Sequence, residues 1–435
     1  MQIITSTGFG DSGSSAVTDL LSEYEDIKSY NSEWECTFLH APDGLGDLED
    51  AIREGHRLKV DFAITRFIEL CKYLDNQTEY KTAFKNKFFE LSIQFVEDFT
   101  DVKWNGMYEE RLPKFTSSLS KKQKRLISFA QTNYNISKSK QFDMYESDSW
   151  RPNYVPYTDM YYSCDLQKFY ECAKKYTSSL FELAADGAER LYLDQLLPPI
   201  SINKYLNYIS NNIKVFVVDK DPRDLFIVEN LFNGSRFIPY ENINTFIKWY
   251  NSTRSKSLES NNTEAIYRCK LDDLVFDYEN QCKKIEAFLG IKSAKHIKNL
   301  EKFNPEKSSV NIRLYEKYDN FTDEVKLIAK ESTEFLAATY TYGNGVDKND
   351  INKNHFVNPI INVMNACNEI QAGNIKSKKI LIAIQSTMMI SITKDFPNRK
   401  SIVKKIKGLV KIFAGLLLFP FELIYNLIVI FIYLN

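Results

Sequence analysis

The sequence lacks several of the patterns by which common classes of protein are recognised. Neither charge dominates, because 56 Lys and Arg residues stand against 57 Asp and Glu, so no basic field points to nucleic acid as a partner. The seven cysteines are odd in number and form no C-x-x-C pair, which argues against a disulfide framework and a cysteine zinc site. We therefore expect a reducing compartment and no metal.

Long apolar runs are also scarce, and the one that could cross a bilayer is "IFAGLLLFPFELIYNLIVIFIYL" at 412–434. Six cations precede it: Arg399, Lys400, Lys404, Lys405, Lys407 and Lys411. This pattern predicts a membrane tail with its basic side in the cytoplasm. Pro420, Glu422 and Asn426 leave open a kinked helix or a helical hairpin in the inner leaflet, and a helix buried against the domain or a dimer partner is a third possibility.

Short apolar runs alternate with helical patterns through the rest of the chain. The runs predict strands at 2–7, 35–40, 190–195, 214–220 and 265–270. Runs that are apolar on both faces and separated by helices are typical of a parallel sheet covered on two sides, so we expect the α/β class. No signal peptide precedes the first strand, which favours the cytoplasmic face of the membrane for the globular part.

The predicted organisation has three parts. An α/β domain covers 1–344 and includes a mostly helical insertion at about 75–185, within which 150–162 is rich in Tyr and Pro. A Ser/Asn-rich loop is expected at 251–263. A polar linker with one short helix covers 345–400, and the basic and hydrophobic tail covers 401–435.

The first strand leads into "GFGDSGSS" at 8–15, which has the G-x-x-x-x-G-S-S spacing of a phosphate-binding loop. Ser14 stands where an NTPase carries its lysine. A glycine-rich turn at the start of a helix presents backbone N–H groups and a positive dipole end, and the hydroxyls of Ser14 and Ser15 add donors. The loop therefore predicts an anion site.

Four segments, in this order, resemble the sulfotransferase family. They are "DSGSS" at 11–15, "RLYLDQLLPP" at 190–199, "VFVVDKDPRDLF" at 215–226 and "CKLDDLVFDYENQCKKIEAFLGI" at 269–291. The resemblance implies a P-loop-like α/β fold and the donor 3′-phosphoadenosine 5′-phosphosulfate (PAPS). It implies a phosphosulfate site in the loop and a 3′-phosphate site at Lys220 and Arg223, with a third contribution from a mobile segment at 305–318. The residues expected to bind the donor are Gly10, Asp11, Ser12, Gly13, Ser14, Ser15, Lys220, Arg223, Lys307, Ser308, Asn311 and Arg313.

Three residues depart from the family pattern. Asp11 stands in place of the family's loop lysine, and a carboxylate about 4 Å from an anionic donor would cost roughly 4 kcal/mol, so Asp11 should point elsewhere. Gln195 stands in place of the family's histidine, and Val228 in place of a serine that contacts the 3′-phosphate. Arg223 has an alternative role as a local partner of Asp221 or Asp224.

Two positions are candidates for the base that deprotonates an acceptor hydroxyl. Asp194 follows an apolar strand, where burial can raise the pKa of a carboxylate to a useful range. His40, with Asp43 nearby in "HAPDG", lies in a region from which some carbohydrate members of the family take their base. A capping or core role is the alternative for His40.

The sequence thus predicts a PAPS-dependent sulfotransferase acting on a hydroxyl of a glycan or lipid-linked saccharide, with an oligomer possible. A non-catalytic sulfotransferase-like protein that binds a glycan or partner is the main alternative, and a P-loop kinase is the other.

Overall fold

Five parallel strands form the sheet at the centre of the molecule. The central strand β1 (Gln2–Gly8) pairs with β5 (Arg190–Tyr192) on one side and with β6 (Asn212–Asp219) on the other. The edges are β2 (Ile27–Lys28) beside β5 and β7 (Ile266–Lys270) beside β6, which gives the order β2-β5-β1-β6-β7. The predicted α/β class with a parallel sheet flanked by helices is confirmed.

The computed structural model describes residues 1–30, 34–106, 125–126, 158–210, 212–233, 237–309 and 312–337. Within these ranges no helix has the length and apolar character needed to cross a membrane. The linker expected at 345–400 and the tail expected at 401–435 lie outside them.

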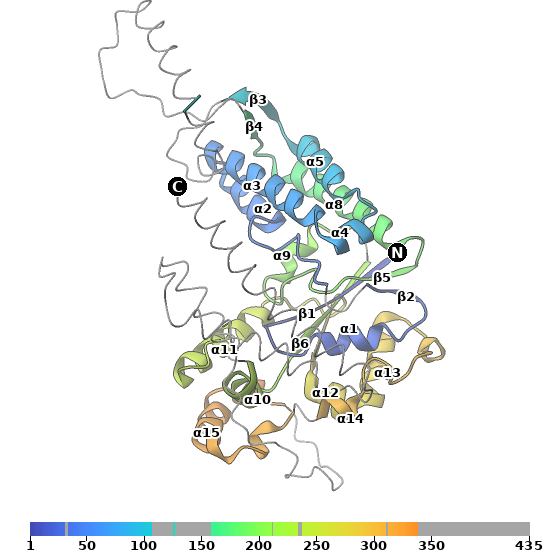
Figure 1. Ribbon diagram of the computed structural model, residues 1–435, viewed down its shortest axis with the longest axis vertical. Coiled ribbons are helices and arrows are strands. Elements are labelled where there is room, and N and C mark those ends of the chain that lie inside the picture. The colour runs from blue at the N-terminus through green and yellow to red at the C-terminus, as the bar shows by residue number, and fades with distance from the viewer. Residues whose placement is uncertain are drawn as a thin grey trace, which may run out of the picture.

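Side chains that alternate along the strands build a core on each face of the sheet. Ile3 and Val215 pack with the helices α2 (Leu45–Glu54), α3 (Arg57–Asp75), α5 (Phe88–Phe99) and α8 (Leu166–Ala185). Ile4 and Phe216 face the opposite way and pack with α1 (Ser15–Leu21), α12 (Leu271–Phe276) and α13 (Tyr278–Leu289). Figure 1 shows the first group of helices above the sheet and the second group below it. Burial of both faces explains why β6 is apolar at each position from Val215 to Val218.

The described parts of the region at about 75–185 are helical apart from one hairpin. Helices α4 (Thr78–Ala83), α5 and α8 pack through a cluster of aromatic rings, and β3 (Val102–Gly106) pairs antiparallel with β4 (Thr158–Tyr162). The hairpin was not predicted. Of the Tyr/Pro-rich stretch, 150–157 lies outside the described residues.

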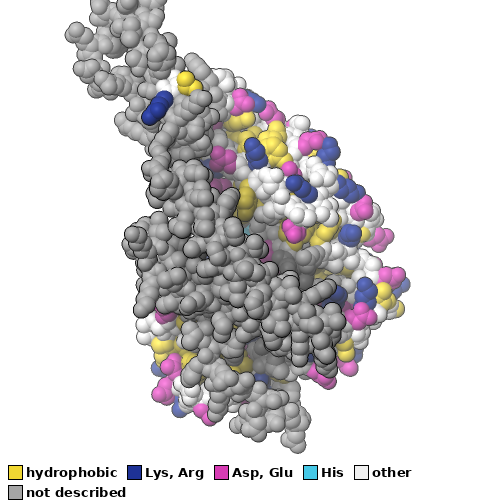
Figure 2. Space-filling view, viewed as in Figure 1, with side chains coloured by type: hydrophobic (Ala, Val, Ile, Leu, Met, Phe, Trp, Pro, Cys, Tyr) yellow, Lys and Arg dark blue, Asp and Glu magenta, His cyan; other side chains and the backbone are white. Residues whose placement is uncertain are grey.

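The remaining helices connect β5, β6 and β7 or follow β7 along the chain. They are α9 (Ile202–Leu206), α10 (Pro222–Val228), the π-helical turn η1 (Glu229–Asn233), α11 (Ile243–Leu258), α14 (Pro305–Ser308) and α15 (Thr322–Glu331). Short 3₁₀ turns are η2 (Ser293–Lys295), η4 (Leu314–Glu316), η5 (Asp319–Phe321) and η6 (Thr333–Phe335). Figure 2 shows acidic and basic side chains interspersed over the described part of one face.

The strand expected at 35–40 is wrong. Residues 34–40 form a loop and turn, in which the N–H groups of His40 and Ala41 both donate to the Thr37 carbonyl. The apolar residues of this segment are buried all the same, because the turn itself packs against the helical layer. Apolar content alone therefore suggested a strand where the backbone forms a turn, with one longer-range bond from Cys36 N–H to the Asp194 carbonyl at 2.8 Å.

The loop expected at 251–263 is wrong over most of its length, since α11 continues to Leu258. Its Ser and Asn residues are poor helix formers, but Tyr250, Arg254 and Ser257 lie on one buried face. Packing of that face outweighs the unfavourable local preference. The strand β5 is also shorter than expected, because the backbone turns at Gln195, whose φ is 53°.

Candidate functional site

The loop between β1 and α1 holds three residues in the left-handed region, Gly10, Asp11 and Gly13, with φ of 84°, 48° and 88°. A β-carbon on Gly13 would lie 2.7 Å from Leu271 Cδ2 and would also be strained by the φ of 88°, which favours glycine there. The backbone N–H groups of residues 10–15 donate to no acceptor among the described residues. Successive unpaired N–H groups in a turn of this kind form a concave site for an anion.

The serines of the loop have different roles. Ser12 is buried, and its Oγ accepts from Phe9 N–H at 3.0 Å and donates to the Val218 carbonyl at 3.0 Å, so it joins the loop to β6. Ser14 accepts a hydrogen bond from Gln195, and Ser15 is exposed. The hydroxyls of Ser14 and Ser15 therefore remain able to donate to a ligand, whereas that of Ser12 is used internally.

We expect the substitution Gly13→Ala to abolish anion binding by the loop. The added methyl group would require the loop or the Leu271 side chain to shift and would also be strained by φ. Gly187 is the matched control, because it has the same φ of 88° but a β-carbon there would meet nothing within 4 Å. Thermal shift with inorganic pyrophosphate should therefore be lost in Gly13→Ala and kept in Gly187→Ala. An equal response of the two variants would contradict this role for the loop.

Asp11 is exposed and makes no hydrogen bond or ion pair with the described residues. Its charge nevertheless acts on Lys220. The carboxylate is thus accommodated in solvent at the rim of the loop, as its charge requires.

Lys220 is the buried cation beside the loop. It follows β6, is 5% exposed, and its ammonium forms no hydrogen bond or ion pair within the described structure. Burial lowers its pKa, and the carboxylates of Asp224, Asp272, Asp11 and Glu229 act in the opposite direction. A lysine held in a mostly buried position without a direct partner is costly, so this position is suited to an anionic ligand.

The other cations at this edge are already committed to protein carboxylates. Arg254 donates from Nε and Nη2 to Asp219 Oδ1 at 3.2 and 2.8 Å, and it lies over the Phe9 ring at 4.0 Å. Lys270 lies 3.6 Å from Asp219 Oδ2. These contacts attach α11 and β7 to the loop and to the end of β6.

Arg223 forms the local pair that the sequence left open. Its Nε and Nη2 donate to Asp221 Oδ1 and Oδ2 at 2.8 and 2.6 Å, and its guanidinium lies 3.7 Å from the centre of the Tyr315 ring. Asp221 is fully buried and also accepts from Ala337 N–H. Arg223 would therefore have to give up part of this bidentate pair to contact a phosphate directly.

Two buried carboxylates lie next to Lys220. Asp224 accepts the N–H groups of Arg313 and Leu314 at 2.6 and 2.7 Å, and burial raises its pKa to about 7. Burial likewise raises the pKa of Asp272 to about 6, and its Oδ2 has no hydrogen-bond partner. At neutral pH this cluster therefore holds protons that an isolated aspartate would have lost.

Asp224, in the first turn of α10, holds the segment 312–318 against that helix by accepting its backbone N–H groups. Within that segment Arg313 is in the left-handed region at φ 54° and its Nε donates to Glu316 Oε1 at 2.8 Å. Lys307 and Ser308 belong to α14, which packs beside α12. Asn311, which was predicted to bind the PAPS donor, lies outside the described residues.

Asp194 lies at the carboxyl end of β5, beside β1. Its Oδ1 accepts the hydroxyls of Ser6 at 2.8 Å and Tyr192 at 3.2 Å, and the Tyr192 oxygen lies 2.6 Å from Thr18 Oγ1 in α1. Burial raises the pKa of Asp194 to about 6, although both hydroxyls lower it. The carboxylate is thus set close to the value that suits a base at neutral pH.

His40 contacts the same edge, but Asp43 does not join it. His40 Nε2 lies 2.7 Å from the Gln195 carbonyl, which can only accept, so Nε2 carries the proton. Burial lowers the pKa of His40 and keeps the ring neutral at pH 7. Asp43 pairs with Arg66 of α3, at 2.7 Å between Oδ1 and Nε.

The sequence did not identify Asp272 or Tyr315 as site residues. It indicated Gln195 only as the replacement of the family's histidine. Asp272 belongs to "KLDDL", which resembled the family but carried no assigned charge role. Its position beside Lys220 depends on β7 lying next to β6. No group of three or more His, Cys, Asp and Glu side chains in the described ranges could hold a metal ion.

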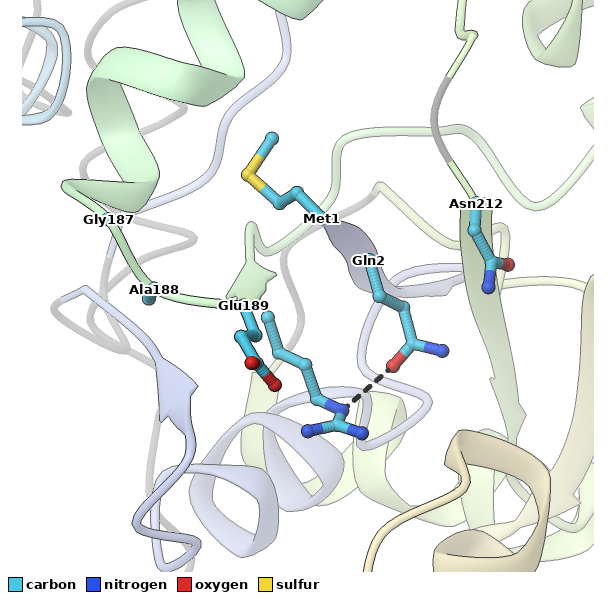
Figure 3. Close-up of a pocket in the computed structure, with 7 residues that line it drawn as sticks. Met1, Gln2, Gly187, Ala188, Glu189 and Asn212 are labelled. Atoms are coloured by element: carbon cyan, nitrogen blue, oxygen red, sulfur yellow. Dashed lines mark hydrogen bonds between the residues drawn. The ribbon is translucent and has the colours of Figure 1, made fainter.

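An open hollow at the opposite edge of the sheet has no connection with these groups. Figure 3 shows that it is lined by the amino ends of β1, β5 and β6, with Met1, Gln2, Gly187, Ala188, Glu189, Arg190 and Asn212. Arg190 there donates to Gln2 and pairs with Asp26. Ligands of open α/β sheets bind at the carboxyl ends of the strands, so we place the functional site at the loop.

Comparison with known proteins adds no relative. The sequence matches no protein-family model, and no curated protein is significantly similar to it. Support for a function therefore comes from the residues at the carboxyl edge of the sheet.

Proposed function

We propose that the protein is a sulfotransferase that moves the sulfonyl group of PAPS to a hydroxyl of a glycan or lipid-linked saccharide. The observation that carries the proposal is that the unpaired N–H groups of residues 10–15 occur together with Lys220, whose side chain is 5% exposed and forms no ion pair with the described residues. The array follows β1 and the ammonium follows β6, and these strands are neighbours.

The order of the strands supports the same location. From β1 the chain first builds β2 and β5 on one side and then β6 and β7 on the other. The crevice at such a reversal, outside the carboxyl ends of the strands, is where open α/β sheets bind ligands. A nucleotide carrying two phosphate groups fits a site with separate donors on β1 and β6.

The chemistry needs few protein groups. The acceptor oxygen attacks sulfur, the bond from sulfur to the phosphate oxygen breaks, and the departing nucleotide takes the electron pair. Asp194 is our candidate for the group that takes the acceptor proton, because burial raises its pKa to about 6 and the hydroxyls of Ser6 and Tyr192 hold its Oδ1. The loop N–H groups and Lys220 would hold the charge that develops on the nucleotide.

The test is a thermal shift with the product nucleotide, 3′-phosphoadenosine 5′-phosphate (PAP). A ligand at 100 times its dissociation constant should stabilise the protein by about 2.7 kcal/mol. Stabilisation by ATP with magnesium but not by PAP would favour a P-loop kinase instead. No response to either nucleotide would favour a non-catalytic binding protein. The pairing of Arg223 with Asp221 is consistent with that alternative, because it occupies the guanidinium expected to bind the 3′-phosphate.

We further propose that the segment 401–435 attaches the protein to the cytoplasmic face of the membrane, where a lipid-linked acceptor would be available. Its support is the run at 412–434 with six cations before it. The chain without 401–435 should leave the membrane fraction, while the full chain should stay in it. Equal retention of the two would show that the segment is not the attachment.

A further inference from the structure

Gln195 connects the candidate base region to the phosphate loop through three hydrogen bonds. Its carbonyl accepts from His40 Nε2 at 2.7 Å, its Oε1 accepts the Thr7 hydroxyl at 3.2 Å, and its Nε2 donates to Ser14 Oγ at 3.0 Å. The backbone N–H of Gln195 donates to the Ser6 carbonyl at 2.9 Å, which places the residue directly beside β1.

The bond to Ser14 decides which way the serine hydroxyl can point. A hydroxyl has one proton and two lone pairs, and an amide N–H can only use a lone pair. Because Gln195 Nε2 occupies that lone pair, the Ser14 proton is directed away from Gln195. The Ser14 hydroxyl has no acceptor among the described residues, so its proton is available to a ligand.

The surroundings of Ser14 identify the class of ligand. The N–H groups of residues 10–15 are unfilled, and Lys220 is more than nine-tenths buried without a partner. A donor hydroxyl beside these groups is complementary to the oxygens of a phosphoryl or sulfonyl group.

We propose that Gln195 is a positioning residue that fixes the Ser14 hydroxyl as a donor to the anion bound in the loop. This inference rests on the proposed function only for the identity of the anion. His40 then acts as a brace, since its neutral ring holds the Gln195 carbonyl while the side chain of Gln195 holds Ser14. The amide of Gln195 can donate to Ser14, and a carboxylate at the same position could not. A carboxylate would accept the Ser14 proton and turn it away from the ligand.

A double-mutant cycle on PAP binding, measured by calorimetry, tests the coupling. Ser14→Ala should weaken binding about tenfold, as expected for one hydrogen bond to a charged group. Gln195→Met, which keeps the length of the side chain without its polar atoms, should weaken binding severalfold. The double variant should bind no more weakly than Ser14→Ala alone, because Gln195 acts through Ser14. Independent, multiplying losses would overturn the proposal.

Gln195→Glu provides a second arm that depends on the direction of the hydroxyl. The carboxylate should capture the Ser14 proton and add a negative charge, so binding should fall more than in Gln195→Met. An unchanged affinity in this variant would overturn the proposal. Gln281→Met is the matched control, since that buried glutamine contacts Tyr267 and Asp277 around α13, away from the loop.

The outcomes separate this inference from the proposed function. If the wild type binds pyrophosphate but not PAP, the cycle is run on pyrophosphate and the nucleotide assignment alone fails. If PAP binds and the cycle is additive, the role of Gln195 fails and the proposed function stands. If the wild type binds neither anion, both fail.

Discussion

Replacing Lys220 by methionine is expected to weaken the binding of PAP by about 10- to 100-fold. Lys220 has no carboxylate within ion-pair distance among the described residues, whereas Arg223, Arg254 and Lys270 each have one. A hydrogen bond between charged groups contributes roughly 1.5–3 kcal/mol, which corresponds to that range of affinity. Methionine has a similar length and tolerates burial, so the side chain can be replaced without leaving a large cavity.

The control for this substitution is Lys214→Met on the same strand. Lys214 lies at the amino end of β6, where its Nζ donates to the Glu264 carbonyl and lies over the Phe288 ring. Calorimetry should give the wild-type affinity for Lys214→Met and the loss only for Lys220→Met. Equal affinity of the Lys220 variant and the wild type would remove Lys220 from the site and with it the main support for the proposed function.

The carboxylates around Lys220 should make this binding depend on pH. Below about 6, Asp224 and Asp272 are protonated in the folded protein, because burial raises their pKa values to about 7 and about 6. As pH rises to 8 both become negative and oppose an anionic ligand, so PAP should bind more tightly at pH 6 than at pH 8. Asp272→Asn should reduce this dependence, since it removes one of the two titrating groups.

Replacing Asp194 by asparagine is expected to lower kcat for sulfonyl transfer by about 10²- to 10⁴-fold, the usual contribution of a general base. Asparagine keeps an oxygen that can accept from Ser6 and Tyr192, so the hydroxyl network and the affinity for PAP should remain. Binding is measured by calorimetry and turnover by transfer of labelled sulfonate. Parallel losses of binding and turnover would indicate a structural role instead.

The pH profile gives an independent reading of the same residue. A base must be ionised, and burial raises the pKa of Asp194 to about 6, so kcat of the wild type should increase as pH rises through about 6 and then level off. This rise of kcat with pH should be absent from the residual activity of Asp194→Asn. His40→Asn should keep it if Asp194 is the base, since the hydrogen bond of the His40 ring is with the Gln195 carbonyl and not with Asp194.

The substitution Asp43→Asn tests whether the base lies in the region of His40 and Asp43 and not at Asp194. Asp43 pairs with Arg66 on α3, away from the hydroxyls that hold Asp194. Its replacement should leave turnover close to that of the wild type. A loss as large as that of Asp194→Asn would move the base to the region around residue 40.

Much of the fold could be predicted because its signals are local. β6 is apolar on both faces from Val215 to Val218, and the loop between 8 and 15 carries glycines at two of its three positions with positive φ, Asp11 being the third. α13 ends at Gly290 in the left-handed conformation, as the sequence indicated. The strand predicted at 35–40 was wrong because the buried side chains of this segment belong to a turn. The length of α11 was predicted too short because its buried face lies on a sequence of poor helix formers.

The candidate site could be predicted only in its location. Spacing alone predicts a loop with free N–H groups and two cations after a parallel strand, and these do meet at one edge of the sheet. It cannot assign partners, since Arg223 and Lys220 are three residues apart and equally cationic. Asp221, in the same turn, takes the arginine in a bidentate pair, and the lysine enters the buried space beside β7 and α10.

By itself, then, the sequence determined a central parallel sheet, a glycine loop shaped for an anion and an edge where cations gather. Only the tertiary structure decided that Lys220 is the uncommitted cation, that Asp194 is buried among hydroxyls and that Gln195 holds Ser14. The physical reason is that these bonds join residues up to 188 positions apart, such as Ser6 and Asp194. The register of β1 with β5 and β6 brings them together, and that register is fixed by the packing of both faces of the sheet.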